Sequence, residues 1–477
     1  MKILYTIYRF IILLIILCPL TAFAQNSFLT TYPTTYDKDA REVLVTPDGG
    51  YLIAGSTNNS NLVDADLYVL KTDAQGVFQW GQIYGGSRPE YAYSMVETSD
   101  GNYFVLGYSQ SFGGGDFDTY LIKISPTGTL LWEKTYGGTG NDHGREIIKT
   151  TDGNYAFVGT TSSGFTSDQA FLTKIDLAGT VLWTKYYGGS MHEGGNTLKE
   201  TADGGFIIAG QTFSYGQSNG SAYLVKTHSN GDTSWTKYYN TGTIISEVNS
   251  LISNADGSFV FVVRDSSSTN DIDVRVMKTD SLGVLAWNKL YSGTKKDTPK
   301  KIQKTSDGGY VIASSSRSFG WLNPDMWILK LNNIGDTTWT KHYGGTNHEH
   351  GNDIKQTADG GYIAVGHAKS YGPDGQRILL VKIPNSTTVG VRINDSEISF
   401  NLFPNPSKNG HLNFQFEKNT LSKITVSNTL GQIIYNEEIV FQSKETKEID
   451  FENNQPGIYL VTVRTENSVI TKKIIIE

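Results

Sequence analysis

One position of this sequence carries a different polar side chain each time its surroundings recur. An Asp-Gly pair is found seven times, and the residue eight positions after its Asp is Ser56, Tyr108, Thr160, Gln211, Arg264, Ser315 or His367. Polar groups that vary at one point of a strict repeat are typical of a binding surface shared by several repeats. We therefore take as candidate ligand contacts Tyr108, Gln211, Arg264 and His367, together with Trp321, an aromatic residue outside the repeated set.

A second polar set is too regular to indicate chemistry. A lysine stands in the third predicted strand of every repeat, and its constant position favours a framework role in which buried groups bond from one repeat to the next. These lysines are Lys71, Lys123, Lys174, Lys226, Lys278, Lys330 and Lys382.

Acidic residues precede five of the seven Asp-Gly pairs by ten positions, and histidines stand near some of them, in segments that we expect to be loops on one face. Carboxylates spread over several repeats would lie too far apart for one Ca²⁺ ion, which needs six to eight oxygens. His348-Glu349-His350 could ligate Zn²⁺, but it lacks a further ligand nearby in the sequence. We predict no metal site, no cofactor and no catalytic residue. The acidic set is Glu90, Asp142, Glu193, Asp297 and Glu349.

The repeat itself predicts the fold. The Asp-Gly pairs begin at residues 48, 100, 152, 203, 256, 307 and 359, so the period is 51 to 53 residues, which is typical of a propeller or a solenoid. Each unit reads as four short strands, and Asp-Gly between β-rich runs marks a tight hairpin. Four strands per unit make one propeller blade. We predict an all-β chain with a seven-bladed β-propeller over residues 25–384.

The seventh repeat lacks its fourth strand, and the N-terminus supplies a candidate. In most repeats a Trp lies twenty residues before the next Asp-Gly pair, and Phe28 lies twenty residues before Asp48. We predict that residues 28–32 pair with residues 378–383 and close the ring, which removes exposed sheet edges.

A glycine of the second hairpin precedes each of these Trp residues by four positions, as Gly128 precedes Trp132. This spacing resembles the tryptophan-docking repeats of quinoprotein propellers. The resemblance implies that each indole packs between neighbouring blades; it does not extend to the quinone cofactor.

The start of the chain reads as a secretory signal over residues 1–24. Lys2 and Arg9 precede an apolar run too short to span a bilayer, and Ala22-Phe23-Ala24 fits a signal-peptidase site. The single cysteine, Cys18, lies within it, so the mature chain is expected to have no disulfide. The net charge of −7 and the absence of a basic cluster disfavour a nucleic-acid partner. No later stretch is apolar enough to cross a membrane.

The C-terminus carries a more specific pattern. It contains Phe-Pro404-Asn405-Pro406, then Leu-Gly431-Gln, then Pro-Gly457-Ile-Tyr459, and finally Lys472-Lys473 before an apolar end. In order and spacing these motifs resemble the type A sorting domain of the type IX secretion system of Bacteroidetes. The resemblance implies export by that machinery and a place on the outer-membrane surface or outside the cell. Alternating runs independently predict a small β-sandwich over residues 398–477, after a polar linker at 385–397.

These observations leave three functions open. We expect a surface or released protein that binds a glycan or protein ligand on the top face, the face opposite the Asp-Gly hairpins, without catalysis. The alternative is an enzyme, either a propeller-based polysaccharide lyase or a glycoside hydrolase; Tyr108, Arg264 and His367 would supply the lyase chemistry. The third is a purely structural surface protein.

Overall fold

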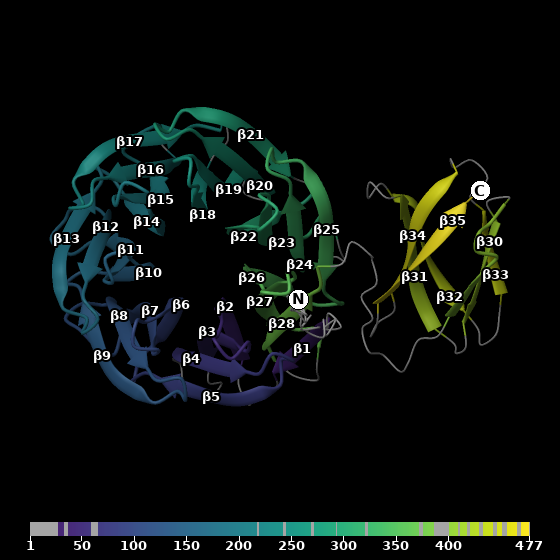
Figure 1. Cartoon of the computed structure of the whole chain (residues 1–477), viewed down its shortest axis with the longest axis horizontal. Coiled ribbons are helices and arrows are strands. Elements are labelled where there is room, and N and C mark those ends of the chain that lie inside the picture. Colours follow the sequence, from purple (N-terminus) through teal and green to yellow (C-terminus); the bar gives the residue numbers. More distant parts are fainter. Residues whose placement is uncertain are drawn as a thin grey trace, which may run out of the picture.

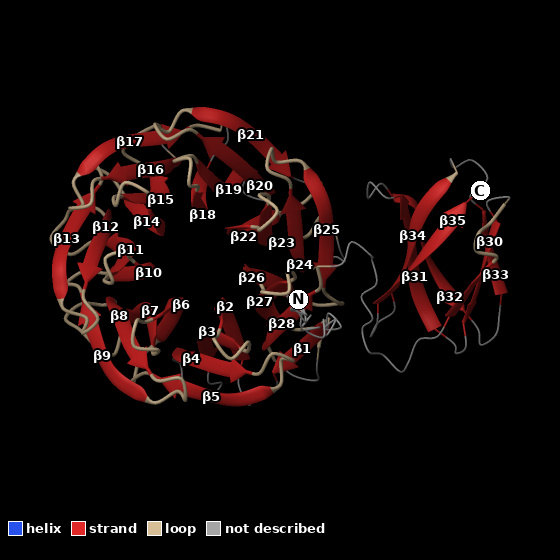
Figure 2. Ribbon diagram, in the orientation of Figure 1, coloured by secondary structure: helices blue, strands red, loops and turns tan. Residues whose placement is uncertain are grey.

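The described part of the chain consists of strands, turns and loops, with no helix (Figure 2). The computed structural model describes residues 27–32, 37–58, 65–216, 219–241, 245–268, 271–291, 293–319, 323–371, 375–385, 400–408, 411–416, 420–428, 433–441, 446–450, 456–464 and 469–476. The predicted signal peptide, most of the predicted linker, Trp321 and Gly431 lie outside these ranges. The prediction of an all-β chain is confirmed for the described residues.

Residues 28–383 form seven successive four-stranded antiparallel sheets, numbered here in chain order and drawn as a propeller-like ring in Figure 1. Sheets 1 to 4 consist of β2 (Asp37–Val45), β3 (Tyr51–Asn58), β4 (Ala65–Thr72) and β5 (Phe78–Tyr84); β6 (Glu90–Glu97), β7 (Tyr103–Ser109), β8 (Asp118–Ile124) and β9 (Leu130–Tyr136); β10 (Asp142–Lys149), β11 (Tyr155–Thr161), β12 (Gln169–Ile175) and β13 (Val181–Tyr187); and β14 (Glu193–Glu200), β15 (Phe206–Thr212), β16 (Ser221–Thr227) and β17 (Thr233–Tyr239).

The remaining three sheets of the ring follow the same order. They consist of β18 (Ile245–Ser253), β19 (Phe259–Ser268), β20 (Asp271–Thr279) and β21 (Leu285–Tyr291); β22 (Asp297–Lys304), β23 (Tyr310–Ser316), β24 (Asp325–Leu331) and β25 (Thr337–Tyr343); and β26 (Glu349–Gln356), β27 (Tyr362–Ala368), β28 (Arg377–Ile383) and β1 (Phe28–Tyr32). In Figure 1 the first strand of each repeat is innermost and the fourth lies at the rim.

Strand β1 is the fourth strand of sheet 7, as the spacing of Phe28 and Asp48 predicted. It pairs antiparallel with β28, and the register runs from Phe28 opposite Lys382 to Tyr32 opposite Ile378. The Tyr32 hydroxyl donates to the carbonyl of Gly76 in sheet 1 at 2.7 Å. One short strand therefore bonds the last sheet to the first.

The Asp-Gly hairpins explain the recurring lysines. Gly204 takes a φ of +76°, which favours glycine, and the Asp203 carboxylate accepts hydrogen bonds from the Gly205 N–H at 3.0 Å and from Lys226 Nζ at 2.8 Å. Equivalent Lys–Asp ion pairs occur in sheets 1, 2, 3, 6 and 7. Both partners belong to the same sheet. The predicted bonding from one repeat to the next is therefore wrong for these lysines, because the first hairpin of each repeat curls back over its own third strand.

Neighbouring sheets are joined instead by the tryptophans. A Cβ on Gly128 in sheet 2 would lie 2.8 Å from the Trp80 ring in sheet 1, and one on Gly231 would lie 2.8 Å from Trp183. Tyr84 adds a hydrogen bond from its hydroxyl to the Gly128 carbonyl at 2.6 Å. The predicted docking of each indole against the next repeat is confirmed at these positions, and it requires glycine at the hairpin tip.

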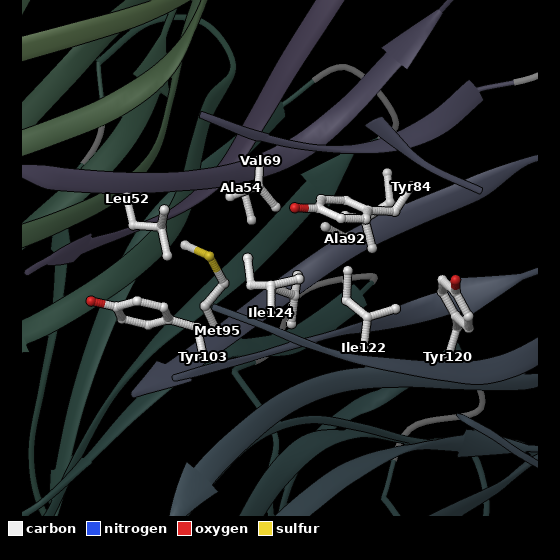
Figure 3. Close-up of a cluster of buried hydrophobic side chains, with 12 residues drawn as sticks. Leu52, Ala54, Val69, Tyr84, Ala92, Met95, Tyr103, Tyr120, Ile122 and Ile124 are labelled. Carbon is white, nitrogen blue, oxygen red and sulfur yellow. The ribbon is translucent and has the colours of Figure 1, made fainter. Parts of the chain in front are cut away.

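The apolar core lies between adjacent sheets rather than within one. Figure 3 shows the cluster between sheets 1 and 2, in which Leu52 and Val69 face Met95, Tyr103 and Ile122. Both faces of an inner strand are covered in such a ring, so the second and third strands read as nearly continuous apolar runs.

The C-terminal residues form two further sheets. One has the order β29-β30-β33 and the other β32-β31-β34-β35, and buried residues of both contribute to one apolar cluster that includes Phe414 and Val461. The strands are β29 (Phe400–Phe403), β30 (His411–Phe416), β31 (Thr420–Asn428), β32 (Ile433–Phe441), β33 (Thr446–Asp450), β34 (Gly457–Arg464) and β35 (Val469–Ile476).

Candidate functional site

Each innermost strand of the ring contains a β-bulge at the same place. The register between the first and second strands shifts around one residue, and that residue always stands seven positions before the Asp of the Asp-Gly pair. A bulge leaves its extra residue unpaired and re-aims the side chain. We call these seven the bulge residues: Arg41, Tyr93, Arg145, Asn196, Asn249, Lys300 and Asn352.

Three sheets carry asparagine at the bulge, and there it has a framework role. The amide of Asn196 donates to the Val248 carbonyl in the next sheet at 3.0 Å, and Asn249 donates to the Pro299 carbonyl at 3.2 Å. Asn352 donates to the Ala40 carbonyl at 2.7 Å. Asparagine at this position therefore fastens one innermost strand to the next.

Sheets 1, 2 and 3 depart from asparagine in succession, and the three side chains meet. The Arg145 guanidinium lies 4.6 Å from the centre of the Tyr93 ring, and that of Arg41 lies 5.3 Å from it. The Tyr93 hydroxyl lies 3.2 Å from that of Tyr108. Burial alone would raise the pKa of Tyr93, but the adjacent charges of Arg145 and Arg41 lower it below its usual value. The arrangement is a phenol held between two cations.

Aromatic groups surround the second phenol of this pair. The Tyr108 ring lies 4.4 Å from the imidazole of His143 and 5.3 Å from Phe117. Burial, and then the charge of Arg145, lowers the pKa of His143 to about 4. His143 is therefore a neutral imidazole near pH 7, and Arg145 is the principal charge of this group.

Asp39 organises the neighbouring part of the ring. Its carboxylate contacts Arg41 Nε at 2.7 Å and His367 Nδ1 at 2.9 Å. The His367 ring lies 4.7 Å from that of His350, whose Nδ1 lies 3.0 Å from the Ser315 hydroxyl. Burial opposes ionisation of Asp39, but the bonds from His367 and Arg41 prevail and lower its pKa. Both carboxylate oxygens of Asp39 are therefore bonded to neighbouring side chains, and Asp39 holds Arg41 and His367 in place.

The five ligand contacts predicted from the sequence do not all belong to these groups. Tyr108 touches Tyr93, and His367 touches Asp39. Arg264 lies 3.6 Å from Glu247, one strand away in sheet 5. Gln211 stands opposite Gly194 in the register of β14 and β15, and no side-chain contact within the described ranges joins it to the others. Trp321 falls outside those ranges. Sequence reasoning missed Tyr93 and Arg145, although the fixed distance of seven residues before each Asp could have revealed them.

The acidic set of the sequence analysis does not form an open ring of carboxylates. Glu193 is the first residue of β14, is buried, and accepts hydrogen bonds from the N–H groups of Gly189 and Ser214 and from the Thr212 hydroxyl. Glu90, Asp142, Asp297 and Glu349 make corresponding bonds. The expected loop position is therefore wrong: these acids begin the innermost strands and hold the loops in place. Among the described residues no group of three or more His, Cys, Asp or Glu is arranged to hold a metal.

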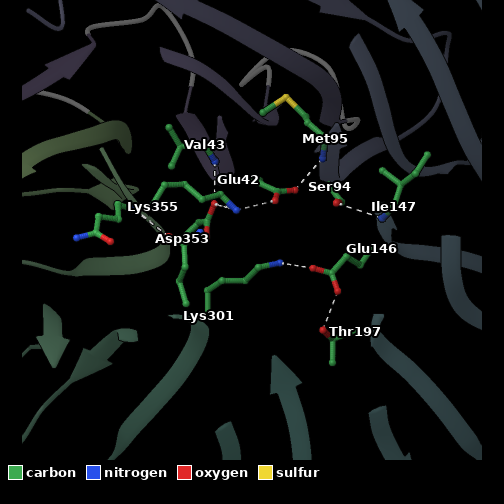
Figure 4. A network of polar contacts seen from close by, with 12 residues as sticks. Glu42, Val43, Ser94, Met95, Glu146, Ile147, Thr197, Lys301, Asp353 and Lys355 are labelled. Carbon is green, nitrogen blue, oxygen red and sulfur yellow. Dashed lines mark hydrogen bonds and ion pairs between the residues drawn. The ribbon is translucent and has the colours of Figure 1, made fainter. Parts of the chain in front are cut away.

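Next to the bulge residues, a buried network of charges crosses the ring (Figure 4). Glu146 of sheet 3 accepts bonds from Lys199 and from Lys301 of sheet 6, each at 2.8 Å. Lys355 lies 3.2 Å from Glu42 and 3.3 Å from Asp353. Burial opposes ionisation of Glu146, but the two ammonium groups prevail and lower its pKa. Three acids and three lysines thus face one another, which indicates a structural role, although the buried Asp353 Oδ1 has no hydrogen-bond partner among the described residues.

The C-terminal motif has its own geometry. The Asn405 side chain donates to the carbonyl of Lys473 at 3.0 Å and accepts from the N–H of Ile475 at 2.9 Å. Pro404 and Pro406 flank it, and Tyr459 is buried in the local core. Asn405 therefore bonds the backbone at the edge of β35 as a neighbouring strand would. This contact joins the Pro404-Asn405-Pro406 motif to the Lys472-Lys473 motif.

Residues 401–477 match the family described as the secretion system C-terminal sorting domain. The chain ends in a type IX secretion sorting domain. It is therefore a secreted or cell-surface protein, and the sorting domain implies contact with the secretion machinery. The described residues contain no helix long and apolar enough to cross a membrane.

Comparison with solved structures adds distant similarities. PorZ, a surface component of the type IX secretion system of Porphyromonas gingivalis, is 12% identical with a TM-score of 0.46, over 94% of this chain and 61% of that one. The chain thus spans less than two thirds of the PorZ structure. The Pan2 WD40 domain of Neurospora crassa is 10% identical with a TM-score of 0.46, over 75% and 94%. An acylaminoacyl peptidase of Pyrococcus horikoshii is 8% identical with a TM-score of 0.42, over 80% and 58%. A search of curated proteins found no match. At such scores these similarities carry no functional argument.

Proposed function

We propose that this protein is a binding module displayed on the cell surface or released from it, with its ligand site at the top face of the ring. In this proposal residues 25–384 form a seven-bladed β-propeller, residues 385–397 a linker and residues 398–477 a β-sandwich that directs export. The seven successive sheets and the pairing of β1 with β28 support the propeller. The apolar cluster shared by the two C-terminal sheets supports the sandwich.

One observation carries the binding site. Asparagine at the bulge fastens adjacent sheets, whereas Arg41, Tyr93 and Arg145 replace it in three consecutive sheets and gather around one another instead. Arg145 forms no ion pair with a carboxylate of the described residues, and its Nε has no hydrogen-bond partner among them. The Arg145 guanidinium lies over the Tyr93 and Tyr108 rings. A partly buried charge without a counter-charge is nevertheless costly, so an anionic ligand group is the better explanation for it.

Binding of the full mature chain to a broad glycan array tests this function. We expect saturable binding that is lost in the Arg145→Asn variant, which restores the framework residue. A chain that binds no glycan on the array would contradict the glycan proposal and favour a protein ligand or a purely structural surface role.

Tyr93 supports a second candidate, a polysaccharide lyase. A phenol whose pKa is lowered by two arginines suits a general base. Tyr93 would take the proton from the carbon next to a uronate carboxylate while an arginine holds that carboxylate. The bond between the sugar carbon and the glycosidic oxygen then breaks, a carbon–carbon double bond forms, and the leaving oxygen takes up the proton.

The two candidates differ in one readout. A lyase produces an unsaturated sugar with new ultraviolet absorbance, and the Tyr93→Phe variant would bind the polymer without producing it. Binding by the wild-type chain with no change in absorbance would reject the lyase and leave the binding module.

A further inference from the structure

Several cations lie around the centre of the ring, and three of them, Arg41, Arg145 and Lys300, occupy the bulge of an innermost strand. Arg145 and Arg41 flank Tyr93. The charges of Arg41 and Arg264 act on Lys300, and those of Arg264 and Arg317 act on Lys296. We call this set the cationic arc: Arg145, Arg41, Lys300, Arg264, Lys296 and Arg317. It draws on sheets 1, 3, 5 and 6.

The cationic arc has few counter-charges of its own. Arg41 pairs with Asp39, and Arg264 pairs with Glu247. Within the described ranges no carboxylate lies at ion-pair distance from the side chains of Arg145, Lys296, Lys300 or Arg317. Four cations of the arc are therefore outside ion pairs in a protein whose net charge is −7, and the charges of Asp39 and Glu247 act on one of them, Lys300.

Cations without ion pairs lower the stability of the fold, so we expect them to have a role in binding. Burial, and then repulsion from Arg41, lowers the pKa of Lys300, while burial and the charges of Arg264 and Arg317 lower that of Lys296. Like charges that depress one another's ionisation destabilise the fold. In the buried network beside the arc, by contrast, each of the three lysines lies in an ion pair with at least one of three acids.

The side chains beside the arc indicate the kind of anion. The residues two positions before the bulges of the innermost strands are Asp39, Tyr91, His143, Gly194, Glu247, Thr298 and His350. Phenol, imidazole and hydroxyl groups thus stand beside the arc, together with two carboxylates that are already in ion pairs. They provide no aliphatic anchor of the kind that fills pockets in peptide recognition. The planar guanidinium of Arg145 suits a carboxylate, and charges spread over four sheets suit a ligand that carries several.

We infer that the site of the proposed function takes an acidic polysaccharide, a chain of uronic-acid residues whose carboxylates bind along the cationic arc, with Arg145 as a principal contact. This inference rests on the proposed function and narrows its ligand to one chemical class.

The test compares polygalacturonate with its fully methyl-esterified form, which keeps the backbone and removes the charge. Calorimetric titration of the full mature chain should show binding of the acid form at least tenfold tighter than binding of the ester. The Arg145→Asn variant should weaken binding of the acid form at least tenfold. Lys149→Asn removes the same charge from an exposed residue at the hairpin end of β10 and should change the affinity less than twofold.

The other outcomes are distinct. Equal binding of acid and ester, or an Arg145→Asn variant that binds like the wild type, would overturn the anionic ligand and leave glycan binding intact. Poly-glutamate bound as tightly as polygalacturonate would overturn the polysaccharide in favour of an acidic protein. A chain that binds neither polymer nor any glycan of the array would overturn the proposed function itself.

Discussion

The hairpin end and the bulge of each innermost strand differ in how strictly their residues are repeated from sheet to sheet. At the hairpin, the same Lys–Asp ion pair is present in six of the seven sheets. At the bulge, asparagine is kept in three sheets and replaced by Arg, Tyr, Arg and Lys in the others. The hairpin solves the same local problem in every sheet. The bulge residue has different neighbours from sheet to sheet. Asparagine is therefore not required where other contacts join neighbouring sheets.

The largest effect should come from the charges that cross the ring. In Glu146→Gln, the buried ammonium groups of Lys199 and Lys301 lose their shared carboxylate, and breaking a buried pair in this way costs about 3–5 kcal/mol. Urea denaturation measures the change in the free energy of unfolding. Glu97→Gln, at an exposed position of β6, is the control and should stay within about 0.5 kcal/mol. Equal stability of the two variants would contradict a stabilising role for the buried charge network.

The hairpin pair should matter less, because its acid is largely exposed. Lys226 is buried, whereas the Asp203 side chain is 64% exposed. Lys226→Met removes its bonds to Asp203 and to the Thr227 carbonyl, and we expect a loss of about 1–2 kcal/mol by the same measurement. A loss as large as that of Glu146→Gln would mean that the hairpins, not the centre, carry the main polar stabilisation.

The hairpins should also set the response to acid. Burial would raise the pKa of Asp203, but bonds from Lys226 and Thr201 lower it to about 2; Asp48 and Asp307 are likewise lowered to about 2. An unfolded Asp titrates near about 3.9, so this stabilisation is complete above about pH 4 and is lost as the pH falls towards 2. The denaturation midpoint should drop over this window, and less steeply in Lys226→Met. An unchanged slope in the variant would contradict this origin.

The smallest effects distinguish the two kinds of bulge residue. Asn196→Ala removes the bond to the Val248 carbonyl and should cost about 1 kcal/mol. Arg145→Asn loses no ion pair, only the contacts of the guanidinium with the Tyr93 and Tyr108 rings, and should cost about 0.5 kcal/mol. Thermal denaturation of both variants checks the difference. If Arg145→Asn were the more damaging, Arg145 would be part of the framework and the proposed site would lose its main support.

The sequence allowed the ring to be predicted because its sheets repeat the same short-range solutions. The Asp-Gly turns, the tip glycines beside the indoles and the pairing of Phe28–Tyr32 with β28 all follow from spacing. The centre of the ring was not predictable in the same way. A bulge interrupts the alternation of faces, so alternation alone does not reveal that Tyr93 and Arg145 approach each other. The contact of Lys301 with Glu146 joins residues 155 positions apart, and no local pattern encodes it.

The ring closure has a consequence for where the chain could begin. Phe28 lies opposite Lys382, so the first strand of the ring starts beside the end of the last one. In the other six sheets the corresponding two strands are joined by a hairpin, as β12 and β13 are. The two ends of the ring, Phe28 and Ile383, thus occupy the place of an interrupted hairpin. A tight turn from Ile383 to Phe28 would make a circular permutant in which all sheets are alike, and new ends could be opened at another loop of the ring.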